Sequence, residues 1–381
     1  MGGTRMNDDR YFDCAASAPP YPEAFRRYEE LSLRLYGNPS SSHDWGRQAH
    51  ESLEASRQGF LARAGLPEEW LVFTSGASEA NNLVIRGVME ANPDGRLLLA
   101  ADVHPSAWFA KDLYSKRTDL LETGPDGRIS VERVEARLTR KTVLVSLLHG
   151  NNETGVLHDV KAIGALCARK GVKLHCDGVQ ALGRIPVNLS EIPFTYYTFS
   201  AHKFGGPRGV GGVIAREPLP RPQISGGGQE EGARGGTENI AGVAAALTAL
   251  ELSLASLERE VPRLRLLGKR LRDELISAIP GAIVNSDLEA GLPGLLSLSF
   301  PNLIGEQIVV EMNLHGFAIS AGSACGSGKM LPSRPVLAMG RTEAQALGTV
   351  RISMGRHNTE ETVLQLASTL KQVVEKQKAL A

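Results

Sequence analysis

The feature that most constrains the fold of this chain is an alternation of short apolar runs with longer segments of helical periodicity. Three segments between the runs carry apolar residues near the 3.6-residue period of a helix: ASEANNLVIRGVMEAN, SVERVEARLTR and HDVKAIGALCARKG. Strands that alternate with helices predict an α/β fold with a mainly parallel, doubly wound sheet, whose ligands bind beyond the carboxyl ends of the strands. Five runs have the length and composition of buried strands: LVFTS (71–75), RLLLAA (96–101), TVLVSLLHG (142–150), VKLHCD (172–177) and YYTFS (196–200).

The rest of the chain has a different pattern, which predicts a smaller α+β domain. Residues 241–278 have the pattern of one or two long helices with a break at Pro262, because proline disrupts the interior of a helix. LLSLSFPN and HGFAISAGSA are typical of strands, TEETVLQLASTLKQVVEKQKAL of an amphipathic closing helix, and SGGGQEEGARGGT of a loop. We therefore expect a large ligand-binding domain at 21–249 and a small domain formed by 1–20 and 250–381.

Composition argues against several classes of protein. The chain has 42 Lys plus Arg and 42 Asp plus Glu, so it lacks the basic excess with which proteins bind nucleic acid. It has no stretch of about 18 uninterrupted apolar residues and no apolar leader in MGGTRMNDDRYFD, so we expect neither a membrane span nor a signal peptide. Its cysteines form no CxxC pair, which argues against a disulfide scaffold or a zinc ribbon and predicts a reducing cytoplasm: Cys14, Cys167, Cys176 and Cys325.

The most reactive candidate follows the strand-like run YYTFS, in the motif YYTFSAHKFGGPRG. There Ser200, His202 and Lys203 bring a hydroxyl, an imidazole and an amine to one strand end. A lysine that is partly desolvated or close to other cations loses its proton more readily and can react with an aldehyde. A plain surface lysine is the alternative interpretation of this motif.

Two other strand ends offer groups that could hold a charged cofactor. Asp177 ends VKLHCD, with Gln180 one turn later; a buried carboxylate there requires a cation, although an aspartate at this place can also cap a helix. FTSGASEANN places Ala77 and Ser78 at the start of a helix, where backbone N–H groups attract one phosphate, or where the helix is simply capped. Neither GK[ST] nor GxGxxG follows a strand, so we expect neither a nucleoside triphosphate nor a dinucleotide.

Five more residues are weaker candidates when each is taken alone. His104 in AADVHPSAW and Asn152 in LLHGNNETG follow strands and could contact an aromatic cofactor or serve as structural residues. Cys325 lies in the Gly- and Ser-rich ISAGSACGSGK, which is typical of an accessible, reactive thiol or of a tolerated surface cysteine. Arg351 and Arg356, in VRISMGRHNT, offer a guanidinium that could bind a carboxylate bidentately or form a surface ion pair.

In this order the motifs resemble the cysteine desulfurases of the NifS and IscS type, members of the class V aminotransferase family that use pyridoxal phosphate (PLP). The resemblance spans nearly the whole chain, from YFDCAASAP through GNPSSSHDWGR and the motifs above to GGGQEEGARGGTENI, SAGSAC and VRISMGR. It implies a fold-type I PLP-transferase-like structure. The chain departs from the family pattern at Cys14–Ala18, at Val103, where an acidic residue is usual, and at Gly178 and Ala201.

The resemblance also implies roles for individual residues. Lys203 would bind PLP covalently, Asp177 would pair with its ring nitrogen, and His104 would stack on the ring and assist proton transfer. Cys325 would receive the sulfur, and Thr237 would reach the phosphate in the partner subunit of a homodimer. The other residues form three sets: Asn152 and Gln180 near the ring oxygen, Ala77, Ser78, Ser200 and His202 at the phosphate, and Asn38 and Arg351 at the substrate carboxylate.

The implied activity is the removal of sulfur from L-cysteine, which leaves L-alanine and a persulfide on Cys325. An acceptor such as an iron–sulfur scaffold would then take the sulfur for iron–sulfur cluster assembly or tRNA thiolation. Two alternatives remain open: a related PLP enzyme that acts on selenocysteine or another C–S substrate, and a non-catalytic homologue that keeps the fold as a scaffold. Retention of Lys203, Asp177, His104 and Cys325 together argues against the scaffold.

Overall fold

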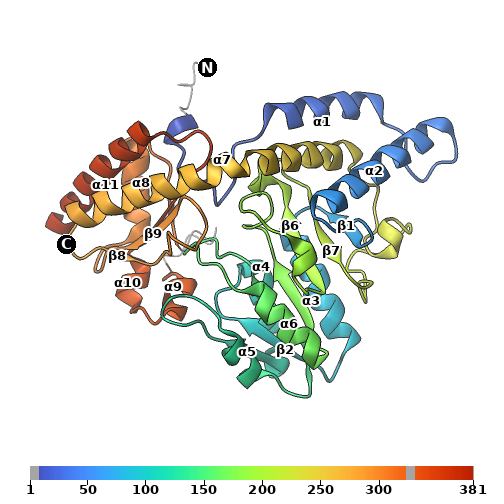
Figure 1. Cartoon of the computed structure of the whole chain (residues 1–381), viewed down its shortest axis with the longest axis horizontal. Coiled ribbons are helices and arrows are strands. Elements are labelled where there is room, and N and C mark those ends of the chain that lie inside the picture. The colour runs from blue at the N-terminus through green and yellow to red at the C-terminus, as the bar shows by residue number, and fades with distance from the viewer. Residues whose placement is uncertain (1–7, 323–330, 381) are drawn as a thin grey trace.

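The computed structural model describes residues 8–322 and 331–380, which form two sheets with covering helices (Figure 1). The larger sheet contains β1 (Trp70–Thr74), β2 (Arg96–Ala100), β3 (Thr118–Leu121), β4 (Thr142–Leu148), β5 (Lys173–Asp177), β6 (Tyr196–Ser200) and β7 (Gly211–Ala215). Its strand order is β1-β7-β6-β5-β4-β2-β3. Strands β2 to β6 pair in parallel, whereas β7 runs antiparallel to both of its neighbours. The predicted α/β class with a mainly parallel sheet is therefore confirmed.

The five apolar runs that the sequence marked as strands correspond to β1, β2, β4, β5 and β6. The other two strands were not predicted. Strand β3, TDLL, lies at the edge of the sheet with only one buried residue, so it lacks a continuous apolar run. Strand β7 begins with two glycines because a Cβ on Gly211 would lie 2.6 Å from Gly76 Cα, and one on Gly212 would lie 2.8 Å from Val72 O. Close backbone packing, which sequence does not reveal, thus displaces the usual β-branched residues.

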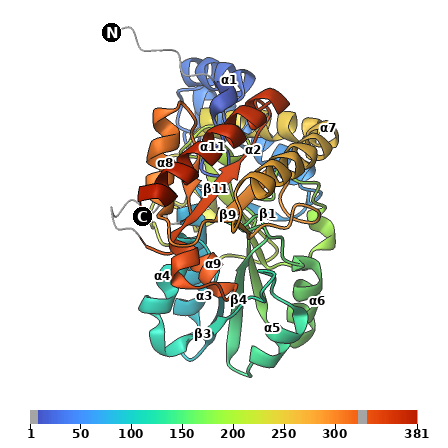
Figure 2. The same cartoon turned by 90° about the vertical axis from the view of Figure 1, so that its left-hand side faces the viewer.

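Helices cover both faces of the large sheet. Figure 2 shows α3 and α4 on one side of β4, and α5 and α6 on the other. Three of them confirm the predicted helical segments, and α6 has clear end signals, with Asp159 accepting from Ala162 N at its start and Gly171 in the left-handed conformation at its end. The helices of this domain are α1 (Pro22–Arg34), α2 (Asp44–Arg63), α3 (Ala77–Ala91), α4 (Pro105–Leu113), α5 (Val131–Arg137) and α6 (Val160–Lys170).

The expected break at Pro262 is wrong, because α7 is one helix from Ile240 to Ala278, with the proline inside it. Proline in a helix interior costs about 3 kcal/mol, and packing on both sides of Pro262 offsets this cost. The first half of α7 packs against α1 and α2, and the second half packs against α11 (Glu360–Leu380) and β9 (Leu295–Ser299). Of the helices in the described ranges, α7 alone has the length and composition to cross a membrane, and 50% of its most apolar stretch is buried inside the protein.

The smaller sheet is fully antiparallel, in the order β10-β11-β9-β8. The N-terminal segment joins it, because Tyr11 bridges to Ala318 and Asp13 to Ser353. Besides β9 and α11, this domain contains β8 (Ile283–Val284), β10 (Ser320–Ala321), β11 (Thr349–Ser353), α8 (Gly305–Leu314), α9 (Arg334–Ala338) and α10 (Glu343–Leu347). Five short 3-10 turns complete the described elements: η1 (Asp8–Arg10), η2 (Ser115–Arg117), η3 (Leu189–Glu191), η4 (Ala201–Lys203) and η5 (Glu230–Gly232).

Two separate apolar cores stabilise these layers. The larger core takes its buried residues from positions between Ala24 and Leu250. The second core joins Phe12 to buried residues between Leu267 and Val374. We use "large domain" and "small domain" for the two sheets with their helices, and the domain boundaries given above stay a prediction.

Candidate active site

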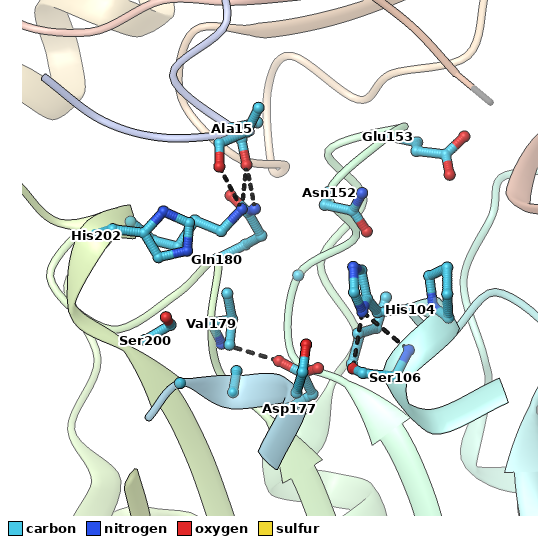
Figure 3. A pocket seen from close by; sticks show the side chains of 18 of the residues that line it. Ala15, His104, Ser106, Asn152, Glu153, Asp177, Val179, Gln180, Ser200 and His202 are labelled. Carbon is cyan, nitrogen blue, oxygen red and sulfur yellow. Dashed lines mark hydrogen bonds between the residues drawn. The ribbon is translucent and has the colours of Figure 1, made fainter. Parts of the chain in front are cut away.

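A cavity of about 500 Å³ lies at the carboxyl ends of the parallel strands (Figure 3). Its floor and sides come from the ends of β1, β2, β4, β5 and β6, and residues of β10 and β11 complete the wall from the small domain. The position agrees with the rule for doubly wound sheets. Ten of the predicted site residues line it: Ala77, Ser78, His104, Asn152, Asp177, Gln180, Ser200, His202, Lys203 and Arg351.

The Lys203 amine is held inside this cavity by the N-terminal segment. Lys203 lies on η4, directly after β6, and its Nζ donates hydrogen bonds to Ala15 O and Ala16 O, both at 2.8 Å. Burial, and then the positive charges of Arg351 and Arg184, lower the pKa of Lys203 to about 7. A large share of the amine is therefore neutral and nucleophilic near pH 7.

Asp177 is the buried carboxylate of the site, with 4% of its surface exposed. Its Oδ2 accepts from Asn81 Nδ2 at 2.8 Å, and its Oδ1 accepts from Val179 N at 3.1 Å. Asn81 is itself fixed, because its Oδ1 accepts from Thr198 Oγ1 at 2.7 Å. The sequence analysis missed Asn81, although a buried amide within the apolar α3 was an available signal.

The start of α3 offers open backbone donors to the cavity. Gly76 is the N-cap, with φ 154° and ψ 176°, a conformation that only glycine adopts readily. Within the described part of the chain no side chain caps this helix, and both Ala77 and Ser78, its first residues, line the cavity. This favours the anion-binding interpretation of FTSGAS over a plain capped helix.

Ser200 and His202 lie on the same side of the cavity as this helix start (Figure 3). His202 Nδ1 contacts Ser17 Oγ at 3.2 Å. Burial, and then the charges of Lys203 and Arg208, lower the pKa of His202 to about 4. Its ring is therefore neutral at pH 7 and can offer a hydrogen bond without bringing a charge.

His104 caps α4 and is oriented by its own helix. Its Nδ1 accepts from Ser106 N at 3.1 Å and contacts Ser106 Oγ at 2.7 Å. Since Nδ1 is an acceptor, the neutral ring carries its proton on Nε2. Burial, and then Lys203 and Arg334, lower the pKa of His104, and Asp177 opposes them. Figure 3 shows the His104 ring and the Asn152 side chain on the same side of the cavity, with Asp177 at its floor.

Arg351 enters from β11 of the small domain. Its Nη1 donates to Asn152 O at 3.0 Å and its Nη2 to Asp13 Oδ1 at 2.5 Å. Its Nε is buried and has no hydrogen-bond partner among residues 8–322 and 331–380. A buried donor without a partner is costly, and a bound carboxylate would satisfy it.

Gln180 completes the predicted residues in the cavity wall, where its Nε2 donates to Ala15 O at 2.9 Å. Asn38 lies in the connection between α1 and α2, where its Oδ1 accepts from Ser40 N at 2.9 Å, and it does not line this cavity. Thr237 lines a neighbouring cavity of about 180 Å³. Cys325 lies outside the described residues.

Comparison with known proteins agrees with this geometry. A sequence model of the family "Aminotransferase class-V" matches residues 10–366. A cysteine desulfurase from Trichormus azollae is 33% identical over 376 residues, covering 97% of this chain and 94% of the relative. A solved NifS-like protein superposes with a TM-score of 0.88 at 30% identity, covering 96% of this chain and 99% of the other.

A second solved structure, of SspA in complex with cysteine, has a TM-score of 0.79 at 25% identity over 92% of this chain and all of the other. The match of the family model and the identity to curated relatives both extend over nearly the whole chain. This chain therefore belongs to the class-V aminotransferase family, among its NifS- and IscS-type members.

Proposed function

We propose that this chain is a cysteine desulfurase that uses PLP to remove sulfur from L-cysteine and releases L-alanine. One observation carries the proposal: a cavity shared by the Lys203 amine, the buried Asp177 carboxylate and the buried Arg351 Nε, which lacks a partner among the described residues. An amine for an aldehyde, an anion for a protonated ring nitrogen and a donor for an α-carboxylate are the groups this chemistry requires.

The chain's own groups fit PLP at each of its ends. The phosphate would bind at the open start of α3, near Ala77, Ser78, Ser200 and His202. Asp177 would hold the ring nitrogen protonated, while Asn152 and Gln180 would lie near the ring oxygen and His104 on the ring face. When bound, PLP supplies an electron sink for the pair of electrons left at the substrate Cα.

The protein groups then bind the substrate and move protons. Arg351 would orient the carboxylate of L-cysteine, and Lys203 Nζ, as a free amine beside the bound substrate, would accept the Cα proton. The low pKa of Lys203 suits this role, because about half of its free amine is neutral near pH 7. His104 Nε2 can return a proton as the product forms.

Cys325 is the proposed sulfur acceptor. Its thiolate would attack the substrate sulfur, so that a new S–S bond forms while the Cβ–S bond breaks and its electrons stay with the carbon. Protonation of that carbon gives L-alanine, and the enzyme keeps a persulfide. Overall, L-cysteine and one thiol become L-alanine and one persulfide.

The homodimer, the acceptor protein and the cytoplasmic location are parts of the same proposal. Large exposed side chains on α1, the α1–α2 connection and the start of α2, among them Phe25, Leu33, Tyr36 and Trp45, support a second copy against this face. An iron–sulfur scaffold is the proposed acceptor, although tRNA thiolation needs the same persulfide. The free, buried Cys14, Cys167 and Cys176 support a reducing compartment.

Two substitutions test this function. Lys203→Ala is expected to abolish the visible absorption of protein-bound PLP together with activity. Cys325→Ser is expected to retain the visible absorption and to lose sulfide release from L-cysteine, and Cys167→Ser in α6 is a matched control for the loss of a thiol. Desulfuration by Cys325→Ser at the wild-type rate would contradict the role of Cys325, and wild-type protein that stays colourless with PLP would contradict the function.

A further inference from the structure

The turn that carries His104 is bound by a side chain from the small domain. This turn links β2 to α4, and Arg334 donates from Nε to Ala101 O at 3.1 Å and from Nη2 to Val103 O. Two of the three peptide carbonyls that precede His104 therefore accept from one guanidinium. A guanidinium has its donors in a fixed planar fork, so the two bonds together define both the place and the tilt of this turn.

The same guanidinium also packs on the helix that His104 caps. The Arg334 Cζ atom lies 4.0 Å from the centroid of the Trp108 ring, and Trp108 is one turn into α4. Arg334 thus has two kinds of contact near the start of α4. It binds the backbone of the turn before His104, and it packs on the ring of Trp108 within the helix. A planar guanidinium can stack flat on an aromatic face, whereas an ammonium acts on the ring as a point charge.

A buried carboxylate fixes the turn from its other side. Asp102 Oδ2 accepts from Asn151 Nδ2 and contacts His158 Nε2, both at 3.0 Å, and Asp102 O accepts from Asn151 Nδ2 at 3.2 Å. Ile129 N donates to His158 Nδ1 at 3.3 Å, which leaves the His158 proton on Nε2, facing Asp102. The large domain therefore holds the inner side of the turn, and Arg334 holds the side toward the small domain.

Arg334 lies where the small domain meets the active site. It is the first residue of α9, and its neighbour Ser333 donates from Oγ to Glu153 Oε2 at 2.6 Å. Glu153 follows Asn152, so these two consecutive residues of the small domain contact two of the loops that carry cavity side chains, those after β2 and β4. None of these contacts involves Lys203 or Asp177, the residues assigned to cofactor binding.

We propose that Arg334 is a positioning residue for His104, which holds the imidazole in its place over the cofactor from the small domain. The inference rests on the proposed function, because it needs His104 to act on the cofactor and the substrate. Among residues 8–322 and 331–380, the charged groups that act on His104 are Asp177, Lys203 and Arg334 itself. A lysine keeps the charge of Arg334 but has neither the fork nor the flat stacking surface.

The test compares Arg334→Lys and Arg334→Ala with the wild type. A displacement of about 1 Å in a catalytic group costs up to about 100-fold in rate, so we expect both variants to lower kcat by about 10- to 100-fold. The KM for L-cysteine should stay within about twofold, because Arg351 is untouched. The visible circular dichroism of bound PLP, which depends on the groups against the ring, should change in both variants.

The two variants separate the effect of the Arg334 charge from its effect on the position of His104. Loss of the Arg334 cation raises the pKa of His104, so the limb of the kcat/KM profile that reports His104 should move to higher pH in Arg334→Ala and stay in Arg334→Lys. Arg341→Ala is the matched control: this half-buried arginine follows α9, and its Nε donates to Asn285 Oδ1 at 3.4 Å within the small domain. It should behave as the wild type.

Wild-type kcat and circular dichroism in Arg334→Lys would overturn the inference, since the charge alone would then suffice. Wild-type values in Arg334→Ala would overturn it too. If the alanine variant fails to fold, the lysine variant decides. A wild-type protein that binds PLP without releasing sulfide would refute the proposed function, whereas the dichroism of the two variants would still decide on Arg334.

Discussion

The low pKa of Lys203 predicts how fast cofactor-free protein takes up PLP at neutral pH. Only a neutral amine attacks an aldehyde. With a pKa of about 7 instead of 10.5, about half of the Lys203 amine is neutral at pH 7, against about one part in 3,000 for an ordinary lysine. The structure therefore predicts that the neutral, reactive fraction of the Lys203 amine at pH 7 is about 1,000 times that of an ordinary lysine.

The assay mixes cofactor-free protein with PLP and follows the rise in visible absorbance at a series of pH values. Nα-acetyl-lysine measured under the same conditions corrects for the ionisation of PLP itself. The corrected rate should reach half its plateau near pH 7 in the wild type. Arg351→Gln removes the cation with the largest lowering effect on this pKa, so its half-plateau should lie at higher pH.

The same pKa affects the free energy of unfolding of the cofactor-free protein. Burial disfavours the protonated form of Lys203. The folded state is therefore destabilised by this group below pH about 7, where the amine is protonated, and is not destabilised by it above the unfolded pKa of 10.5. Between these two pH values the unfolded chain binds more protons than the folded protein. The contribution of Lys203 to the free energy of unfolding therefore rises with pH, by about 5 kcal/mol in total. Lys203→Met lacks this contribution, so its urea-unfolding free energy should exceed that of the wild type most clearly at low pH.

Two results would refute this account of Lys203. One is an uptake rate that continues to rise up to the pKa of free lysine, with the same profile in Arg351→Gln. The other is an unfolding free energy of Lys203→Met that differs from the wild type by the same amount at every pH. Either result would mean that the amine is solvated in the cavity, and that the cofactor alone accounts for its reactivity.

Two further substitutions test the buried acids. Asp177→Asn replaces a charged partner of the ring nitrogen, so the affinity for PLP should fall by about 10- to 100-fold; fluorescence titration measures it, and an unchanged affinity would contradict the assigned role. Asp102→Ala leaves the His158 and Asn151 donors without their acceptor, and a buried donor left without a partner costs about 1–3 kcal/mol in the free energy of unfolding. Urea unfolding measures this loss, the exposed Asp94→Ala is the control, and a loss below about 1 kcal/mol would contradict these buried hydrogen bonds.

The sequence predicted the reactive side of the cavity because each reactive group follows a strand. Lys203 comes directly after β6, Asp177 ends β5, and His104 follows β2. Parallel strands have their carboxyl ends at the same edge of the sheet, so residues at these ends lie close together even when they are far apart in sequence. Apolar runs with a polar end therefore predicted both the sheet and the placement of these groups.

The supporting contacts could not be predicted in this way. Asn81 lies within α3, and its position is determined by Asp177 and Thr198, which reach it only when the sheet has formed. Pro262 likewise breaks a helix in isolation but not in α7, because packing on either side of it outweighs one lost hydrogen bond. Periodicity reports only on residues that are close in sequence, whereas the conformations of Asn81 and Pro262 depend on residues that are distant in sequence and close in the fold.

Arg334 shows why this difference bears on mechanism. Residues 331–333, directly before it, form no strand, and the sequence analysis found no motif there, yet its guanidinium binds two carbonyls of the His104 turn. The geometry of that turn depends on how the small domain sits against the large one, because the donor and the acceptors belong to different domains. The small domain also supplies Arg351. Orientation of the substrate carboxylate and placement of the imidazole therefore depend on one domain arrangement, and a change in that arrangement would alter both together.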